Sequence, residues 1–198
     1  RRAHKLEIGG EHLATAWSKY NPDQIWFTIH DLGSDPLDPP LLFEREVAGP
    51  ITFMAIHDSL LAIAIDGDLA ENIELFERRG PAAWEHVATI EKPRISYTPS
   101  ADFLGHHLIT AATNDGFELY DLSDPSNPIL ERRFNVPGTA VDVAAKGERL
   151  YVAHKEGGLR VLERNAHGRY RQIFNHIDES IWTDVAVSSD RSLVVAST

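Results

Sequence analysis

The chain of 198 residues contains no cysteine. This absence excludes disulfides, cysteine nucleophiles and zinc or iron-sulfur sites held by thiolates. It leaves the cellular compartment open, because a cysteine-free chain suits reducing and oxidising surroundings equally. Long apolar runs are also missing, since no stretch approaches the roughly 18 residues that a membrane helix requires. We therefore expect no transmembrane segment.

Positive charge is scarce as well. The 19 Lys and Arg residues face 30 Asp and Glu residues, which gives a formal net charge of −11. Such a chain repels a phosphate backbone unless a local basic patch outweighs the total, so we expect no nucleic-acid partner. The hydrophobic content of 42% is enough to bury a core in a chain of this length.

One short apolar pattern recurs along the whole chain. A leucine is followed by any residue, a β-favouring residue and an alanine, and successive copies lie about 42 to 48 residues apart. Self-similarity at this spacing is typical of solenoids and of propeller blades. The copies are "HLATAW" at 12–17, "LLAIAI" at 60–65, "HLITAA" at 107–112, "RLYVAH" at 149–154 and "SLVVAS" at 192–197.

Three further strand patterns accompany the first. The segment after it alternates strictly and ends on an acid, which predicts a strand with one buried face: "IWFTIHDL" at 25–32, "IELFERR" at 73–79, "FELYDLS" at 117–123 and "LRVLERN" at 159–165. A charged segment follows, as an unpaired outermost strand requires: 41–47, 84–90, 129–135 and 171–176. A segment of small and β-branched residues opens each unit, at 4–8, 51–56, 95–99, 140–145 and 183–187.

Proline marks the turn between the third and fourth strands. The stretch "YDLSDPSNPIL" at 120–130 places Asp124, Pro125 and Pro128 there, and "DLGSDPLDPP" at 31–40 does the same in the first unit. Proline fixes φ and lacks the backbone N–H, so a β-ladder cannot continue through it. The repeat unit is therefore four strands long.

Four-stranded units of this length predict an all-β fold, a β-propeller of antiparallel blades. Strongly helical stretches are absent, which argues against an α-solenoid, and a β-sandwich does not explain the self-similarity. We expect one propeller domain over 1–198, with blades at 4–47, 51–90, 95–136 and 140–176 and a partial blade at 183–197. About four and a half blades do not close a ring, so we expect a part of a larger ring, completed by missing blades or by a second chain.

The stretch from 116 to 163 resembles the LVIVD-repeat proteins, a β-propeller family. The resemblance rests on "DLSDPSNP", on Pro137 and Gly138 before "AVDVA", on Gly147 and on "GGLRVLE". It implies a propeller fold, often on surface-exposed or secreted prokaryotic proteins, and it implies no common catalytic site. The second unit departs from the pattern, because it contains the acidic insertion "DGDLAEN" and lacks the Asp-Pro turn.

Two groups of residues invite a metal hypothesis. His106 and His107 are adjacent, and in a strand their side chains would point to opposite faces, so the pair would not ligate one ion unless a turn lies there. The acids of "DGDLAE" at 66–71 have only part of a calcium-loop pattern, and Asp-Gly is itself a hairpin signal. We expect no metal and no cofactor, and no nucleophile or phosphate-binding motif is present.

The loop face, where the connections between blades meet the inner strands, is the expected binding surface. Arginine and aromatic residues are enriched at interface hot spots, although blade packing would use the same aromatics. The sequence thus favours a non-catalytic scaffold that binds a protein or glycan partner; the alternative is an enzyme with a site in the central channel. The candidate binding residues are Arg94, Tyr97, Thr139, Asp142, Trp182 and Asp184.

Overall fold

The computed structural model describes residues 2–18, 25–67, 70–93, 98–112, 116–135, 138–155, 158–176, 182–188 and 193–197. The regular secondary structure of these residues consists of β-strands alone. No helix among them is long and apolar enough to cross a membrane. The chain divides into two compact units: unit 1 comprises Arg1–Ile95 and Pro125–Asn127, and unit 2 comprises Ser96–Asp124 and Pro128–Thr198.

Unit 1 contains two four-stranded antiparallel sheets, each built in chain order. The first sheet consists of β1 (Arg2–Gly9), β2 (His12–Ser18), β3 (Ile25–Asp31) and β4 (Leu41–Val47). The second consists of β5 (Ile51–His57), β6 (Leu60–Asp66), β7 (Ala70–Gly80) and β8 (Ala83–Pro93). One apolar cluster joins them, with Phe27 and Phe76 fully buried at its centre and their rings 5.2 Å apart.

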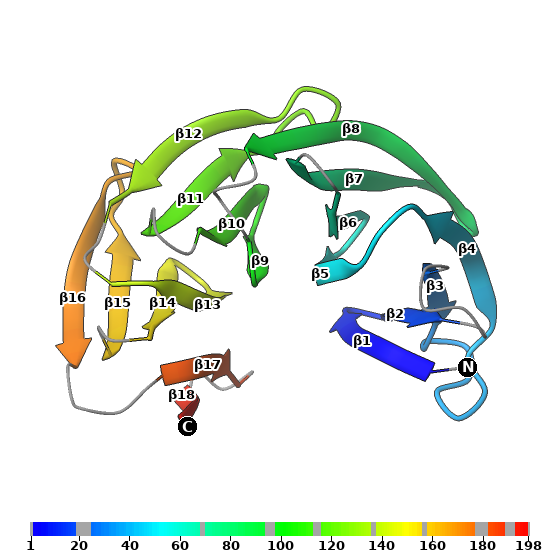
Figure 1. Cartoon of the computed structure of the whole chain (residues 1–198), viewed down its shortest axis with the longest axis horizontal. Helices are drawn as coiled ribbons and strands as arrows, with labels where there is room; N and C mark the ends of the chain where they lie inside the picture. Colours follow the sequence, from blue (N-terminus) through cyan, green and yellow to red (C-terminus); the bar gives the residue numbers. More distant parts are fainter. Residues whose placement is uncertain are drawn as a thin grey trace. The chain divides into compact units, whose positions relative to one another are not determined.

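Unit 2 repeats the arrangement (Figure 1). The third sheet consists of β9 (Ala101–Leu104), β10 (His107–Ala112), β11 (Gly116–Asp121) and β12 (Ile129–Phe134). The fourth consists of β13 (Ala140–Lys146), β14 (Arg149–His154), β15 (Gly158–Arg164) and β16 (Tyr170–His176), and β17 (Trp182–Val187) pairs with β18 (Leu193–Ser197). Phe117, Leu150 and their neighbours form a cluster that both four-stranded sheets share.

The predicted fold class is confirmed. The structure has four four-stranded antiparallel sheets that begin and end close to the predicted strands, and the proline turn at 124–128 connects β11 to β12. One strand was predicted wrongly: the opening strand of the third sheet is β9 at Ala101–Leu104, whereas 98–99 of the predicted 95–99 lie outside any strand. The apolar pattern did not indicate this strand because β9 has only four residues. Pro99 also interrupts the segment that was predicted instead. The expected single domain over 1–198 stays a prediction.

Each outermost strand contains a β-bulge at the same place. The register of β4 against β3 skips Leu42, and the equivalent pairings skip Val87, Glu131 and Ile173. A bulge twists an edge strand and interrupts its ladder, which discourages pairing with another chain. The charged character predicted for these strands has the same effect. A bulge also changes the direction of the side chain of the extra residue, which in β12 is Glu131.

The acids that end the third strands differ in what they contact. Asp31 accepts a hydrogen bond from the Gly33 backbone N–H at 2.9 Å, and Asp121 accepts one from Ser123 at 2.8 Å. The two glutamates at the same position, Glu77 and Glu163, form ion pairs with arginines instead. The aspartates therefore hold the turns that follow their strands, and the glutamates do not.

Candidate functional site

The loop-face residues divide into three groups. Arg94 and Tyr97 lie outside the described residues, and Trp182 opens β17. Thr139 directly precedes β13, where it is half-buried. Asp142 on β13 and Asp184 on β17 lie close enough to share a hydrogen bond. The structure thus brings together two of the six predicted residues, and a binding role for them stays a prediction.

Asp142 and Asp184 form a carboxyl pair. Burial and the hydrogen bond to Asp184 raise the pKa of Asp142, hydrogen bonds from Ser100 and the Val185 N–H act in the opposite sense, and the result is a pKa of about 7. Two carboxyl groups this close are most stable when they share one proton. The pair can therefore donate or accept a proton near neutral pH.

Asp142 also connects the fourth sheet to β17. Its Oδ2 accepts a hydrogen bond from the Val185 backbone N–H at 2.7 Å. Asp102 on β9 makes the same kind of bond to the Ala145 N–H on β13, also at 2.7 Å. Sequence reasoning missed Asp102 because the strand that carries it was placed at 95–99. The available signal was the recurrence of an aspartate at Asp102, Asp142 and Asp184, which are 40 and 42 residues apart.

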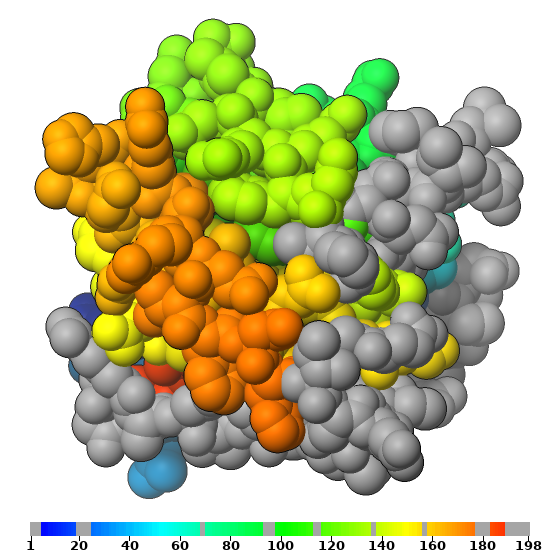
Figure 2. All heavy atoms as spheres, turned by 90° about the vertical axis from the view of Figure 1, so that its left-hand side faces the viewer, coloured from blue at the N-terminus to red at the C-terminus, as the bar shows by residue number. Residues whose placement is uncertain are grey.

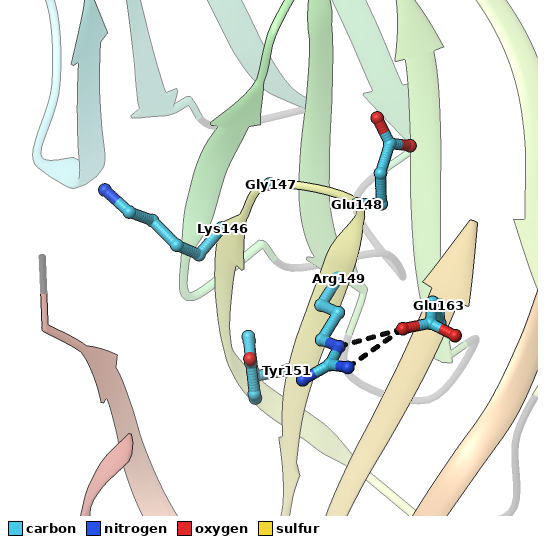
Figure 3. Close-up of a pocket in the computed structure, with 6 residues that line it drawn as sticks. All are labelled: Lys146, Gly147, Glu148, Arg149, Tyr151 and Glu163. Atoms are coloured by element: carbon cyan, nitrogen blue, oxygen red, sulfur yellow. Dashed lines mark hydrogen bonds and ion pairs between the residues drawn. The ribbon is translucent and has the colours of Figure 1, made fainter. Parts of the chain in front are cut away.

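A hollow lies at the other end of the fourth sheet, at the β13–β14 turn (Figure 3). Its volume is about 440 Å³. Arg149 on β14 donates through two nitrogens to the same oxygen of Glu163, at 3.0 Å each, and the bond to Glu163 raises the pKa of Arg149. The Lys146 side chain points away from this ion pair. The lining residues are Lys146, Gly147, Glu148, Arg149, Tyr151 and Glu163.

A second hollow of about 480 Å³ adjoins the first through Glu148. It lies at the β15–β16 turn, which Asn165 stabilises by accepting hydrogen bonds from the His167 and Arg169 N–H groups at 2.9 and 3.0 Å. Its lining residues are Glu148, Arg164, Asn165, Ala166 and Gly168. We call the turns 146–149 and 163–168 together the hairpin edge of the fourth sheet. Sequence reasoning placed no site there, because hairpin turns rich in charge are common on any surface.

The histidine pair lies at the corresponding turn of the third sheet. The sequence argument allowed a joint site only if a turn lies there, and the structure has that turn: the centroids of the two rings are 4.1 Å apart. His106 lies in the β9–β10 turn and only His107 belongs to β10, so the strand alternation does not apply to the pair. Together with Asp121 they are the one group among the described residues that has metal-ligand spacing. Burial and the neighbouring His106 lower the pKa of His107.

The acidic segment at 66–72 forms the predicted hairpin between β6 and β7. Asp68 lies outside the described residues. Glu71 is buried and accepts a hydrogen bond from the Thr52 hydroxyl at 2.9 Å. This glutamate on β7 is therefore directed at β5, which lies two strands away in its own sheet.

Comparison with known proteins agrees with this architecture. The computationally designed Ika8 protein, in its crystal structure, matches with a TM-score of 0.69 and 12% sequence identity. The match covers 94% of this chain and 53% of that protein, so the chain spans about half its length, and at this identity the likeness shows the fold alone. A search of curated proteins finds no match. The LVIVD repeat family matches residues that include both the histidine pair and the 146–149 turn of the hairpin edge. The chain therefore contains two adjacent LVIVD repeats, one at residues 105–136 and the other at 137–163.

Proposed function

We propose that this chain is a non-catalytic β-propeller scaffold that binds a protein partner at the hairpin edge of the fourth sheet. The observation that supports the proposal is the pair of adjoining hollows, of about 440 and 480 Å³, that share Glu148. Exposed charges of both signs line them: Lys146 borders the first hollow and Glu148 borders both. Paired strands hold these turns in place, so a partner would meet a surface that is already ordered.

One further feature favours a protein over a glycan, and another favours the hairpin edge over the loop face. The strand that leaves the hairpin edge, β16, exposes Ile173 and Phe174, whose exposed fractions are 38% and 50%. Figure 2 shows this strand, in orange, at the surface of the molecule. Exposed apolar side chains beside charged groups match the composition of protein interfaces. On the loop face, in contrast, Asp142 already accepts the Val185 N–H.

A charge swap tests this surface. The double variant Lys146→Glu with Glu148→Lys keeps the net charge and alters two exposed side chains, so it should leave the thermal midpoint unchanged. We expect capture of a protein from cell extract by the immobilised chain to fall at least about tenfold, as when one hot-spot contact is lost. The matched control on the loop face is Thr139→Ala with Asp184→Ala, which should retain capture.

The outcomes separate the alternatives. Loss of capture in the loop-face control alone would move the site to the predicted loop face. Binding to a glycan array without any captured protein would replace the protein partner by a glycan. A wild-type chain that captures nothing beyond what its heat-denatured form captures would contradict the scaffold proposal.

The carboxyl pair favours a second candidate, an enzyme with a site at the inner strands. A group with a pKa of about 7, as Asp142 has, can act in proton transfer at neutral pH. For such an enzyme, turnover of a substrate should change with an apparent pKa near 7, and Asp142→Asn should abolish that dependence. A rate that Asp142→Asn leaves unchanged would exclude this candidate.

A further inference from the structure

We propose that His106, His107 and Asp121 bind a divalent transition-metal ion of the zinc type, with Glu131 as the carboxylate that orients His107. The site lies in the first of the two LVIVD repeats and is independent of the hairpin-edge proposal. Imidazole and carboxylate are ligands that zinc accepts, and three protein ligands leave one position open for water or a partner's side chain.

The distances suit a single ion after small side-chain movements. One ligand atom from each of the three residues lies within 4.8 Å of the others. Nε2 of His106 is 3.8 Å from Oδ1 of Asp121. Ligand bonds of roughly 2.0 to 2.2 Å place two atoms on the same zinc ion at most about 4 Å apart. The exposed His106 side chain can make up the difference by rotation about its own bonds.

The backbone holds the ligands in position before any ion binds. Gly105 has a φ of +58°, a left-handed conformation that favours glycine and makes the tight turn before His106. The His106 carbonyl accepts the Leu122 N–H at 2.9 Å, so the turn is attached to the residue that follows Asp121. His107 and Asp121 are register partners across β10 and β11. The three ligands therefore come from one well-connected corner of the sheet.

Glu131 provides the second part of the site. It is the bulge residue of β12, and its Oε2 lies 3.0 Å from Nε2 of His107. The other ring nitrogen of His107, Nδ1, is buried and has no hydrogen-bond partner within the described part of the chain. A metal ion on Nδ1 and the Glu131 carboxylate on Nε2 would give both ring nitrogens of His107 a partner, as is usual for metal-bound histidines.

The first sheet provides an internal comparison. His12 and Asp31 are register partners there, as His107 and Asp121 are in the third sheet. However, Glu11 stands before His12 instead of a second histidine, and the Arg78 guanidinium lies 2.7 Å from Nε2 of His12. The pair of imidazoles is thus a property of the third sheet and not of the repeat fold as such.

Zinc titration of the whole chain by calorimetry, after treatment with a chelator, tests the site. We expect one ion per chain, and the variant His106→Ala should weaken binding at least about 100-fold, because it removes a ligand. Glu131→Gln should weaken it about tenfold, as expected for a group that orients a ligand. The control is His57→Ala, which removes an exposed histidine at the end of β5, beside the corresponding turn of the second sheet, where its Nε2 lies 3.4 Å from Asp58. This control should bind zinc as the wild type does.

Cobalt serves as a second probe on the unaltered chain. Bound by two imidazoles and a carboxylate, Co²⁺ should show intense visible absorption that stoichiometric zinc removes and excess calcium leaves unchanged. Equal zinc affinity in the wild type and His106→Ala would overturn the proposal. So would cobalt absorption no stronger than that of the hydrated ion.

Discussion

Replacement of Gly9 by alanine should lower the free energy of unfolding of unit 1 by about 3 kcal/mol. Gly9 ends β1 where it meets β5, and a Cβ there would lie 2.6 Å from the carbonyl carbon of Ile56 and 2.8 Å from Cγ2 of the same residue. A backbone group cannot move aside as a flexible side chain does, so the two strands would have to separate. Urea denaturation followed by circular dichroism measures the loss.

The adjacent Gly10 is the matched control. It has a φ of +59°, and an added Cβ would meet no atom within 4 Å. Gly10→Ala should therefore cost only the backbone strain of the left-handed conformation, about 1 to 2 kcal/mol. If Gly9→Ala costs no more than Gly10→Ala, the first strands of the two sheets of unit 1 do not pack as closely as described.

The sequence predicted the strands well because each sheet repeats the same alternation of buried and exposed positions. Leu61 and Leu108 were aligned from the sequence, and both are fully buried at the same place in β6 and β10. The buried positions of a strand must be apolar. In a strand that is long enough, these positions give an alternating apolar pattern that can be recognised in the sequence.

The side-chain groupings were less predictable, because they depend on single-residue shifts. The two histidine rings lie together only because the β9–β10 turn includes His106 and not His107. Glu131 reaches His107 through a bulge, and bulges follow from the register of two strands, which is set by contacts distant in sequence. Neither shift alters the hydrophobic pattern from which the strands were predicted.

The aspartates of the inner strands show how one residue type serves both fold and chemistry. Asp102 and Asp142 each accept a backbone N–H from the next inner strand at 2.7 Å. These bonds attach β13 to β9 and β17 to β13. Asp142 also has a carboxyl neighbour, Asp184, so the same position that joins the strands holds a proton near neutral pH.

Protonation of Asp142 makes the stability of unit 2 depend on pH. Its folded pKa of about 7 lies above the ordinary value of 3.8, so between these values the folded chain binds a proton that the unfolded chain has lost. The stabilisation is complete below about pH 4 and is lost as the pH rises through 7. His154 acts in the opposite sense, because burial lowers its pKa from 6.5 to about 4 and the folded chain loses stability as the pH falls through that range.

The variant Asp142→Asn separates these two contributions. Asparagine keeps a side-chain oxygen for the Val185 N–H but has no proton to gain, so the opposing effect of His154 is left unbalanced. Between pH 4 and 7 the free energy of unfolding of the variant, relative to the wild type, should rise by up to about 1.4 kcal/mol per pH unit, which corresponds to one proton. Urea denaturation of both chains across this range measures the difference, in which His154 and the other histidines cancel because both chains contain them. Parallel profiles for the two chains would show that Asp142 is ionised throughout and that the carboxyl pair shares no proton.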